Sequence, residues 1–222
     1  MKILALEFSS ARRGVAVGEA VPPSDGTLPA QVLGLAEAEG ITPGPLALVE
    51  SALRSAQVER EQIECIAVGL GPGSYTGVRS AIALAQGWQL ALGVKLLGIS
   101  SADVLAATAH AAGLTGRVAV VIDALRGEFY SASYDLAADG WRGVASLRLL
   151  TREAVEALAT SGEQLVSSDT KCPFAGARIL LASAGELARL AATRTNFQPG
   201  EKLEPIYLRE TTFVKAPPPR FY

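Results

Sequence analysis

The stretch GLGPGSYTGVR, residues 69–79, carries the clearest structural signal in this 222-residue chain. It follows the apolar run Cys65–Gly69, which has the length and composition of a buried strand. Its glycines predict a tight turn from strand to helix, because glycine adopts backbone angles that other residues avoid. A long helix is therefore expected to follow, over roughly Thr76–Leu92.

The same loop has a second interpretation, as a site for an anion. Backbone N–H groups at the start of a helix can hold a phosphate. The loop is not a Walker A sequence, however, because no Lys-Ser or Lys-Thr pair follows it. Spacing alone favours the tight turn over the phosphate site. Arg79 is the only charged residue of the expected helix, and it could form a local ion pair or contact a partner.

The expected helix is apolar nearly all round, which indicates burial on more than one side. The second side could face the core of this chain or another protein, and the sequence leaves both open. A shorter amphipathic helix is expected to begin at Pro45, a residue that suits the first turn of a helix.

Two parts of the chain open with the same pattern of apolar strand, acidic residue, turn and return strand. Lys2–Leu6 leads to Glu7, and Arg117–Ile122 leads to Asp123 and the return strand Glu128–Tyr134. The repetition predicts a duplicated α/β domain in which helices pack on mixed sheets. We expect an N-terminal subdomain over residues 1–100, a C-terminal subdomain over residues 101–215 and a flexible tail over residues 216–222.

Composition excludes several functions. The chain is 49% hydrophobic and 19% charged, a composition typical of a folded protein. Its net charge is −2, and it lacks the basic stripe typical of an RNA-binding protein. One histidine and two cysteines argue against a metal site and against a Ser-His-Asp triad. We expect no cofactor and no metal. We also expect a cytoplasmic protein, since neither a signal peptide nor a membrane span is evident.

The acidic residues of the two hairpins raise the question of nucleotide binding. Sugar kinases and actin-like ATPases carry an aspartate followed by small residues at the end of the first strand, whereas this chain has Glu7 followed by Phe8. We therefore predict no catalytic residue. The candidate remnants of phosphate-binding loops are Glu7, Ser9, Ser10 and Asp123. The alternatives are an ATP-dependent small-molecule kinase, a metallopeptidase and a homodimeric scaffold with unrelated partners.

The motif GPGSYTGVR resembles the TsaB family, also called YeaZ, whose pattern there is close to GPGSFTGLR. Its residues are Gly71, Pro72, Gly73, Ser74, Tyr75, Thr76, Gly77 and Arg79. The segments ILALEFSS, IDALRGEFY and PIYLR support the resemblance, in the same order along the chain. The chain departs from the family at Glu7-Phe8, where Asp-Thr is usual.

The resemblance implies an actin/hexokinase-like (ASKHA) fold and a role without catalysis. TsaB proteins are thought to be scaffolds that pair with TsaD, a catalytic subunit, and cooperate with TsaE, a small ATPase. Together these transfer threonylcarbamoyl from its adenylate to N6 of adenosine 37 of tRNA, which this subunit would touch only indirectly. The resemblance also implies that two N-terminal helices bind the partner, or a second copy when alone. The expected interface residues are Leu46, Val49, Leu53, Ala81, Ala85, Trp88 and Leu92.

Overall fold

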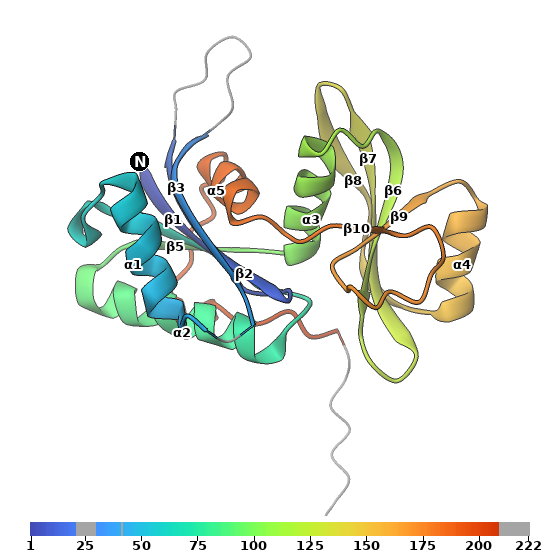
Figure 1. Cartoon of the computed structure of the whole chain (residues 1–222), viewed down its shortest axis with the longest axis horizontal. Coiled ribbons are helices and arrows are strands. Elements are labelled where there is room, and N and C mark those ends of the chain that lie inside the picture. The colour runs from blue at the N-terminus through green and yellow to red at the C-terminus, as the bar shows by residue number, and fades with distance from the viewer. Residues whose placement is uncertain (21–29, 41, 209–222) are drawn as a thin grey trace, which may run out of the picture.

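The computed structural model describes residues 1–20, 30–40 and 42–208 (Figure 1). The flexible tail expected over residues 216–222 lies outside these ranges. Strands and helices form two lobes, each built on a five-stranded mixed sheet. The strand orders are β3-β2-β1-β4-β5 in the first sheet and β10-β9-β6-β7-β8 in the second.

The first lobe begins with three antiparallel strands and continues with two parallel ones. Its strands are β1 (Lys2–Glu7), β2 (Arg12–Ala20), β3 (Ala30–Glu39), β4 (Cys65–Gly69) and β5 (Lys95–Ile99). Its helices are α1 (Pro45–Ala56), the short 3-10 turn η1 (Arg60–Gln62) and α2 (Tyr75–Leu92). The expected strand–glycine loop–helix unit is therefore present at β4 and α2.

The second lobe repeats this arrangement. Its strands are β6 (Gly116–Asp123), β7 (Glu128–Ala137), β8 (Gly140–Thr151), β9 (Gln164–Ser167) and β10 (Arg178–Ile179). Its helices are α3 (Ser101–Ala111) and α4 (Arg152–Thr160). In each lobe the first strand pairs antiparallel with the second and parallel with the fourth. The duplicated α/β fold is thus confirmed.

The elements stack in alternating layers, with helices on both faces of each sheet (Figure 1). α1 and α2 cover the outer face of the first sheet, and α4 covers the outer face of the second. α3 and α5 (Ala184–Ala192) share one apolar cluster between the two sheets. This cluster joins the lobes, because it contains residues from β1, β4, β6 and β7.

The chain crosses back to the first lobe near its end. α5 packs on β1 and β2, although it belongs to the range expected to form the second subdomain. The 3-10 turn η2 (Gly200–Lys202) then contacts α2, with Gln86 donating to the Gly200 carbonyl at 2.8 Å. The division at residue 100 remains a prediction. α3 has no counterpart among the expected elements, because it is buried on most sides and lacks a polar face.

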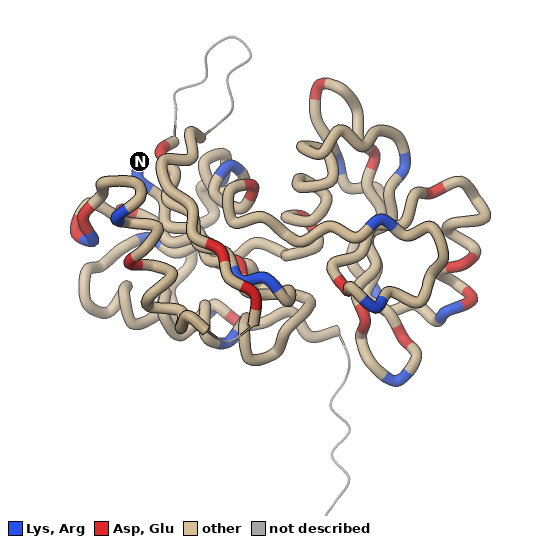
Figure 2. The backbone as a smooth tube through the Cα atoms, in the orientation of Figure 1, with Lys and Arg blue, Asp and Glu red and all other residues tan. Residues whose placement is uncertain are grey.

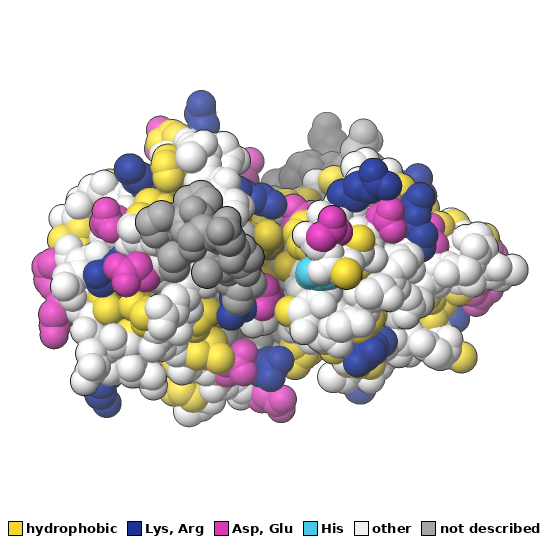
Figure 3. Space-filling model, turned by 90° about the horizontal axis from the view of Figure 1, so that it is seen from above, with side chains coloured by type: hydrophobic (Ala, Val, Ile, Leu, Met, Phe, Trp, Pro, Cys, Tyr) yellow, Lys and Arg dark blue, Asp and Glu magenta, His cyan; other side chains and the backbone are white. Residues whose placement is uncertain are grey.

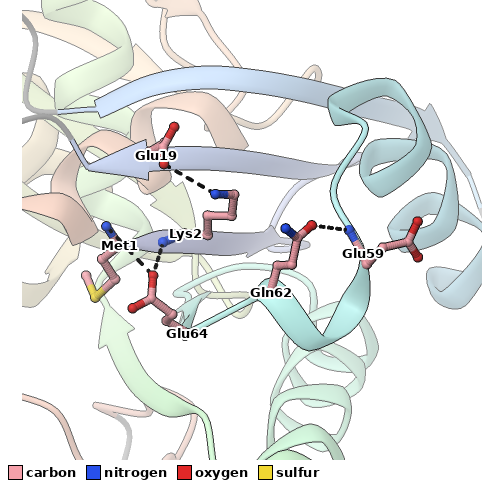
Figure 4. A network of polar contacts seen from close by, with 6 residues as sticks. All are labelled: Met1, Lys2, Glu19, Glu59, Gln62 and Glu64. Atoms are coloured by element: carbon pink, nitrogen blue, oxygen red, sulfur yellow. Dashed lines mark hydrogen bonds and ion pairs between the residues drawn. The ribbon is translucent and has the colours of Figure 1, made fainter.

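The N-terminus is fastened to the loop before β4 by a polar network (Figure 4). The Lys2 backbone N–H donates to Glu64 Oε2 at 2.7 Å, and Lys2 Nζ lies 3.3 Å from Glu19 Oε1. Beside it, Glu59 and Gln62 form a capping box around η1. Because these groups are largely exposed, the network orients the strand ends more than it stabilises the fold.

Charges of both signs are scattered over the two lobes (Figure 2), and the face seen in Figure 3 also mixes them. No continuous basic stripe crosses the described residues in these views, as the net charge of −2 had indicated. Within the described ranges, no helix is both long enough and apolar enough to cross a membrane.

The packing of α1 on the sheet yields a prediction about Gly34 in β3. A Cβ at this position would overlap the Ala52 carbonyl oxygen and lie 2.7 Å from the Ala56 nitrogen, both in α1. Gly34→Ala should therefore lower the free energy of unfolding by about 1–3 kcal/mol, the usual cost of overpacking. Gly143→Ala is the matched control, because nothing lies within 4 Å of its added Cβ. Equal denaturation midpoints for the two variants would contradict this account of the helix–sheet contact.

Candidate functional site

The glycine loop is pressed against the turn of the first hairpin. A Cβ on Gly73 would overlap the Ser9 carbonyl oxygen, and one on Gly77 would overlap the Phe8 carbonyl oxygen. The Ser74 N–H donates to the Ser9 carbonyl at 2.6 Å. Gly71 and Gly73 have φ of +82° and +147°, in the region that favours glycine. The glycines therefore permit close contact between two backbone segments.

The start of α2 is capped from within the loop. Ser74 is the N-cap residue, and its Oγ accepts a hydrogen bond from the Gly77 N–H at 3.3 Å. This capping bond already uses one of the backbone N–H groups that a bound anion would need. The geometry thus supports the tight-turn interpretation of the motif over the phosphate site.

Glu7 is enclosed directly behind this loop. Its side chain has no exposed surface, and a Cβ on Gly69 would overlap its carboxylate. Glu7 Oε1 accepts from the Ser9 N–H at 2.9 Å, and Ser101 Oγ donates to the carboxylate at 3.1–3.2 Å. Ser101 Oγ also accepts from the Gly71 N–H at 3.1 Å. We call these residues, Glu7, Ser9, Gly71 and Ser101, the Glu7 knot.

The knot joins three segments that are far apart in the sequence: the end of β1, the glycine loop and the start of α3. A carboxylate without exposed surface cannot touch a phosphate in this conformation. The interpretation of Glu7 as a remnant of a phosphate-binding loop stays a prediction. Ser9 and Ser10 are nearly buried as well, with 4% and 9% exposure. The extra methylene of glutamate carries the carboxylate into the protein, where Ser101 binds it.

Asp123 of the second hairpin lies in a different environment, at the carboxyl end of β6. Its N–H donates to Asp169 Oδ2 at 2.6 Å, and its own Oδ1 accepts from the Leu125 N–H at 2.8 Å. Burial, and then the Asp123 charge, raise the pKa of Asp169 above its ordinary value, although hydrogen bonds oppose this. Asp169 is not among the site residues predicted from the sequence. Its place directly after an apolar strand, like that of Asp123, is the signal that could have revealed it.

The two carboxylates border a cavity of about 440 Å³, here called the hairpin cavity. Its lining residues are Ala11, Asp123, Phe129, Arg152, Ser168, Asp169, Thr170, Lys171 and Pro173. It therefore receives residues from both hairpins, with two carboxylates and two cations. Among the described residues, no group of three or more His, Cys, Asp and Glu side chains is placed to hold a metal ion. His110 Nε2 instead lies 2.7 Å from the Ala137 carbonyl oxygen.

Four of the seven residues predicted for a partner interface, Leu46, Val49, Trp88 and Leu92, line an apolar groove between α1 and α2. This α1–α2 groove has a volume of about 410 Å³. Its lining residues are Leu46, Val49, Glu50, Arg60, Glu61, Ala83, Leu84, Gly87, Trp88, Ala91 and Leu92. Leu46 and Leu92 are 62% and 47% exposed. Trp88 is half-buried, and its indole N–H has no hydrogen-bond partner among the described residues.

Val49 and the three remaining expected interface residues point into the first lobe. Leu53, Ala81 and Ala85 belong to the cluster beneath α1 and α2, with at most 5% exposure, and Val49 contributes only to the floor of the groove. These side chains hold the helices to the sheet and offer no surface to a partner. The sequence could not separate them from Leu46 and Leu92, because both helices are apolar on more than one side.

The two lobes, each opening on a hairpin whose first strand ends in an acidic residue, define a protein of the actin/hexokinase-like class. Residues 45–188 match the family model described as TsaD, tRNA N6-adenosine threonylcarbamoyltransferase. The chain belongs to this family, and within it to the TsaB (YeaZ) proteins.

Relatives and solved structures agree with this assignment. The tRNA threonylcarbamoyladenosine biosynthesis protein TsaB of Escherichia coli K12 is 29% identical over 192 residues, covering 78% of this chain and 82% of the relative. TsaB of Haemophilus influenzae is 28% identical, covering 78% and 81%. The structure of YeaZ from Pseudomonas aeruginosa superposes with a TM-score of 0.71 at 28% identity, covering 93% and 99% of the two chains. Another Pseudomonas aeruginosa structure, an uncharacterized protein with similarity to peptidase YeaZ, gives 0.74 at 28% identity, covering 94% and 99%.

The Glu7 knot yields a prediction about pH. Burial raises the pKa of Glu7 above its ordinary value, against the hydrogen bonds from Ser9 and Ser101 that lower it. Folding then favours the protonated carboxyl, so this contribution to stability is greatest at low pH and is lost as pH rises through the folded-state pKa. The melting temperature of Glu7→Gln, relative to that of the parent chain, should therefore increase as pH rises from 5 to 8. The expected increase is about 2–4 °C for each kcal/mol of unfolding free energy that the parent chain loses over this range.

Glu201→Gln, at an exposed position in η2, is the control for this measurement. Its melting temperature should follow the parent chain at every pH. If the melting temperature of Glu7→Gln instead falls further below that of the parent chain as pH rises, the hydrogen bonds of the carboxylate hold it ionised, contrary to the argument from burial.

Proposed function

We propose that the chain takes part in threonylcarbamoyladenosine modification of tRNA in the cytoplasm, as a non-catalytic subunit that pairs with a TsaD-like catalytic subunit. The α1–α2 groove is the observation that supports pairing. It combines exposed Leu46 and Leu92 with a half-buried tryptophan, and tryptophan is among the residues that dominate binding energy in protein interfaces. A TsaE-like ATPase would join the pair, and a second copy of the chain would cover the groove when the partner is absent.

The state of the first hairpin supports a role without catalysis. An actin-like phosphotransferase needs an accessible carboxylate near the phosphates, whereas Glu7 is buried and bound to Ser101. The loop of the first hairpin is covered by Gly73 and Ser74, which contact the Ser9 carbonyl. The chain has a negative net charge, and its charged residues are dispersed over both lobes. We therefore assign tRNA binding to the other subunits.

Leu92→Glu should abolish pairing with the TsaD-like subunit of the same source. A carboxylate buried without a partner costs several kcal/mol, and each 1.4 kcal/mol is a factor of ten in affinity, so we expect about 100-fold weaker binding or more. Leu90→Glu is the matched control, because Leu90 lies on the same helix with 90% exposure and outside the groove. Light scattering after size-exclusion chromatography measures the mass of each variant alone and in a mixture with the TsaD-like subunit, and so shows whether a complex forms.

Leu92 is preferred to Trp88 for this test, because Trp88 also packs against the core and its substitution could unfold the lobe. Unimpaired pairing by a folded Leu92→Glu variant would overturn the assignment of the groove. No complex between the unaltered chain and the TsaD-like subunit would remove the main support for the function.

Reconstituted modification separates a supporting role from a catalytic one. With the chain, the TsaD-like and TsaE-like subunits, threonylcarbamoyl adenylate, ATP and substrate tRNA, omission of the chain should abolish the modified nucleoside detected by mass spectrometry. Leu92→Glu should do the same. Asp123→Asn should leave the rate within about twofold, the scatter expected for a group outside the chemistry. A loss of about 100-fold with the complex intact would make Asp123 part of a catalytic site.

The second candidate is an ATP-dependent small-molecule kinase. The hairpin cavity favours it, since about 440 Å³ between two hairpins could admit a ligand and places Asp123 and Asp169 beside Arg152 and Lys171. Calorimetry with Mg-ATP distinguishes the candidates. Micromolar binding that Asp123→Asn abolishes would favour the kinase, whereas the supporting role predicts no such binding.

A further inference from the structure

A second exposed feature lies at the opposite end of α2 from the α1–α2 groove. Tyr75 is the first residue of this helix, and Arg79 stands one turn further along. The C-terminal segment brings Tyr207 beside them, with Tyr75 and Tyr207 ring centroids 6.0 Å apart. We call Tyr75, Arg79 and Tyr207 the Tyr–Arg cluster. About 25 Å of helix separates Tyr75 from Leu92 in the groove.

The side chains of the cluster interact with one another although they are exposed. The Arg79 guanidinium lies 4.6 Å from the centroid of the Tyr75 ring, and its interaction with the Tyr207 hydroxyl raises the pKa of the guanidinium. The two tyrosines remain 58% and 50% exposed. A guanidinium that already stacks on the Tyr75 ring loses less conformational freedom when it binds, so the cluster is partly organised in advance for a partner.

The backbone beneath the cluster is fixed by hydrogen bonds. The Ile206 N–H donates to the Leu70 carbonyl at 2.9 Å, which attaches the C-terminal segment to the loop before α2. The Ser74 N–H is bound to Ser9 on the other side of that loop. Tyr75 and Tyr207 therefore meet only because residues 70 and 206 are tied together.

The charge of the cluster is uncompensated within the described residues. No carboxylate there lies within 4.0 Å of the Arg79 guanidinium, whereas Arg12, Arg60, Arg142 and Arg194 each have one. The planar fork of Arg79 can take a carboxylate with two parallel hydrogen bonds. The flanking tyrosines, which are 58% and 50% exposed, would contact the apolar groups around that carboxylate.

Two other kinds of ligand fit less well. The crevice under the cluster has a volume of about 30 Å³, room for about one water molecule, whereas small-molecule sites occupy about 300–1,000 Å³. A nucleic acid would need several cations for its phosphates, whereas the cluster offers one guanidinium on a chain of net charge −2.

We propose that the Tyr–Arg cluster is a docking point for a second protein, which places an aspartate or glutamate on Arg79 and an apolar side chain against Tyr75 and Tyr207. This surface is separate from the α1–α2 groove, so both can be occupied at once. The proposal does not depend on the identity of the partner in the groove.

The test uses the full chain and an unbiased phage-displayed library of short peptides. Selected peptides should share an acidic residue next to an apolar one. Fluorescence polarisation with the synthetic peptides should show binding that Arg79→Ala and Tyr207→Ala each weaken by about tenfold or more, as expected for an interface hot spot. Arg117→Ala is the matched control, since Arg117 is exposed on β6 in the other lobe and should not change the affinity.

A charge exchange makes the test specific. Arg79→Glu should lose the selected peptides and regain those in which lysine replaces the acidic residue. Melting temperatures check that each variant is folded. The proposal is overturned if no peptide is enriched, if the enriched peptides lack an acidic residue, or if they bind Arg79→Ala unchanged. It is also overturned if a labelled RNA hairpin binds the chain and Arg79→Ala abolishes that binding, because the surface would then take nucleic acid.

Discussion

The close contact between the glycine loop and the first hairpin governs the rest of the first lobe. Only glycine at positions 73 and 77 lets the loop lie on the carbonyl oxygens of Phe8 and Ser9. Behind this contact, the Glu7 knot ties the end of β1 to the loop and to the start of α3. The loop fixes where α2 begins, and the knot fixes where the second lobe begins.

The same contact explains why the two hairpins differ chemically. In the first, the acidic side chain is buried and serves as an acceptor for Ser9 and Ser101. In the second, Asp123 lies at the edge of the hairpin cavity, and its N–H is bonded to Asp169. The two hairpins share one topology but place their acidic side chains in different environments.

α2 connects the features to which we assign binding. Its buried side holds the helix on the sheet through Val78, Ala81 and Ala85. Its C-terminal half contributes Trp88 and Leu92 to the groove, and its first turn carries the Tyr–Arg cluster. A helix anchored at both ends by tertiary contacts is a rigid support, which suits the supporting role that we propose for the chain.

The sequence by itself determined the strand–loop–helix unit at residues 65–92, the repeated hairpins and the family resemblance, because local composition and glycine geometry act over short distances. Of the seven residues predicted for a partner interface, Leu46, Trp88 and Leu92 are at least partly exposed in the groove, and their role there stays a prediction. Only the tertiary structure decided that Leu53 and Ala85 are core residues, because an all-round apolar helix gives no signal for which side meets the sheet. Likewise, the Glu7–Ser101 pair and the Tyr75–Tyr207 contact join residues 94 and 132 positions apart, and only the folded topology brings such distant residues together.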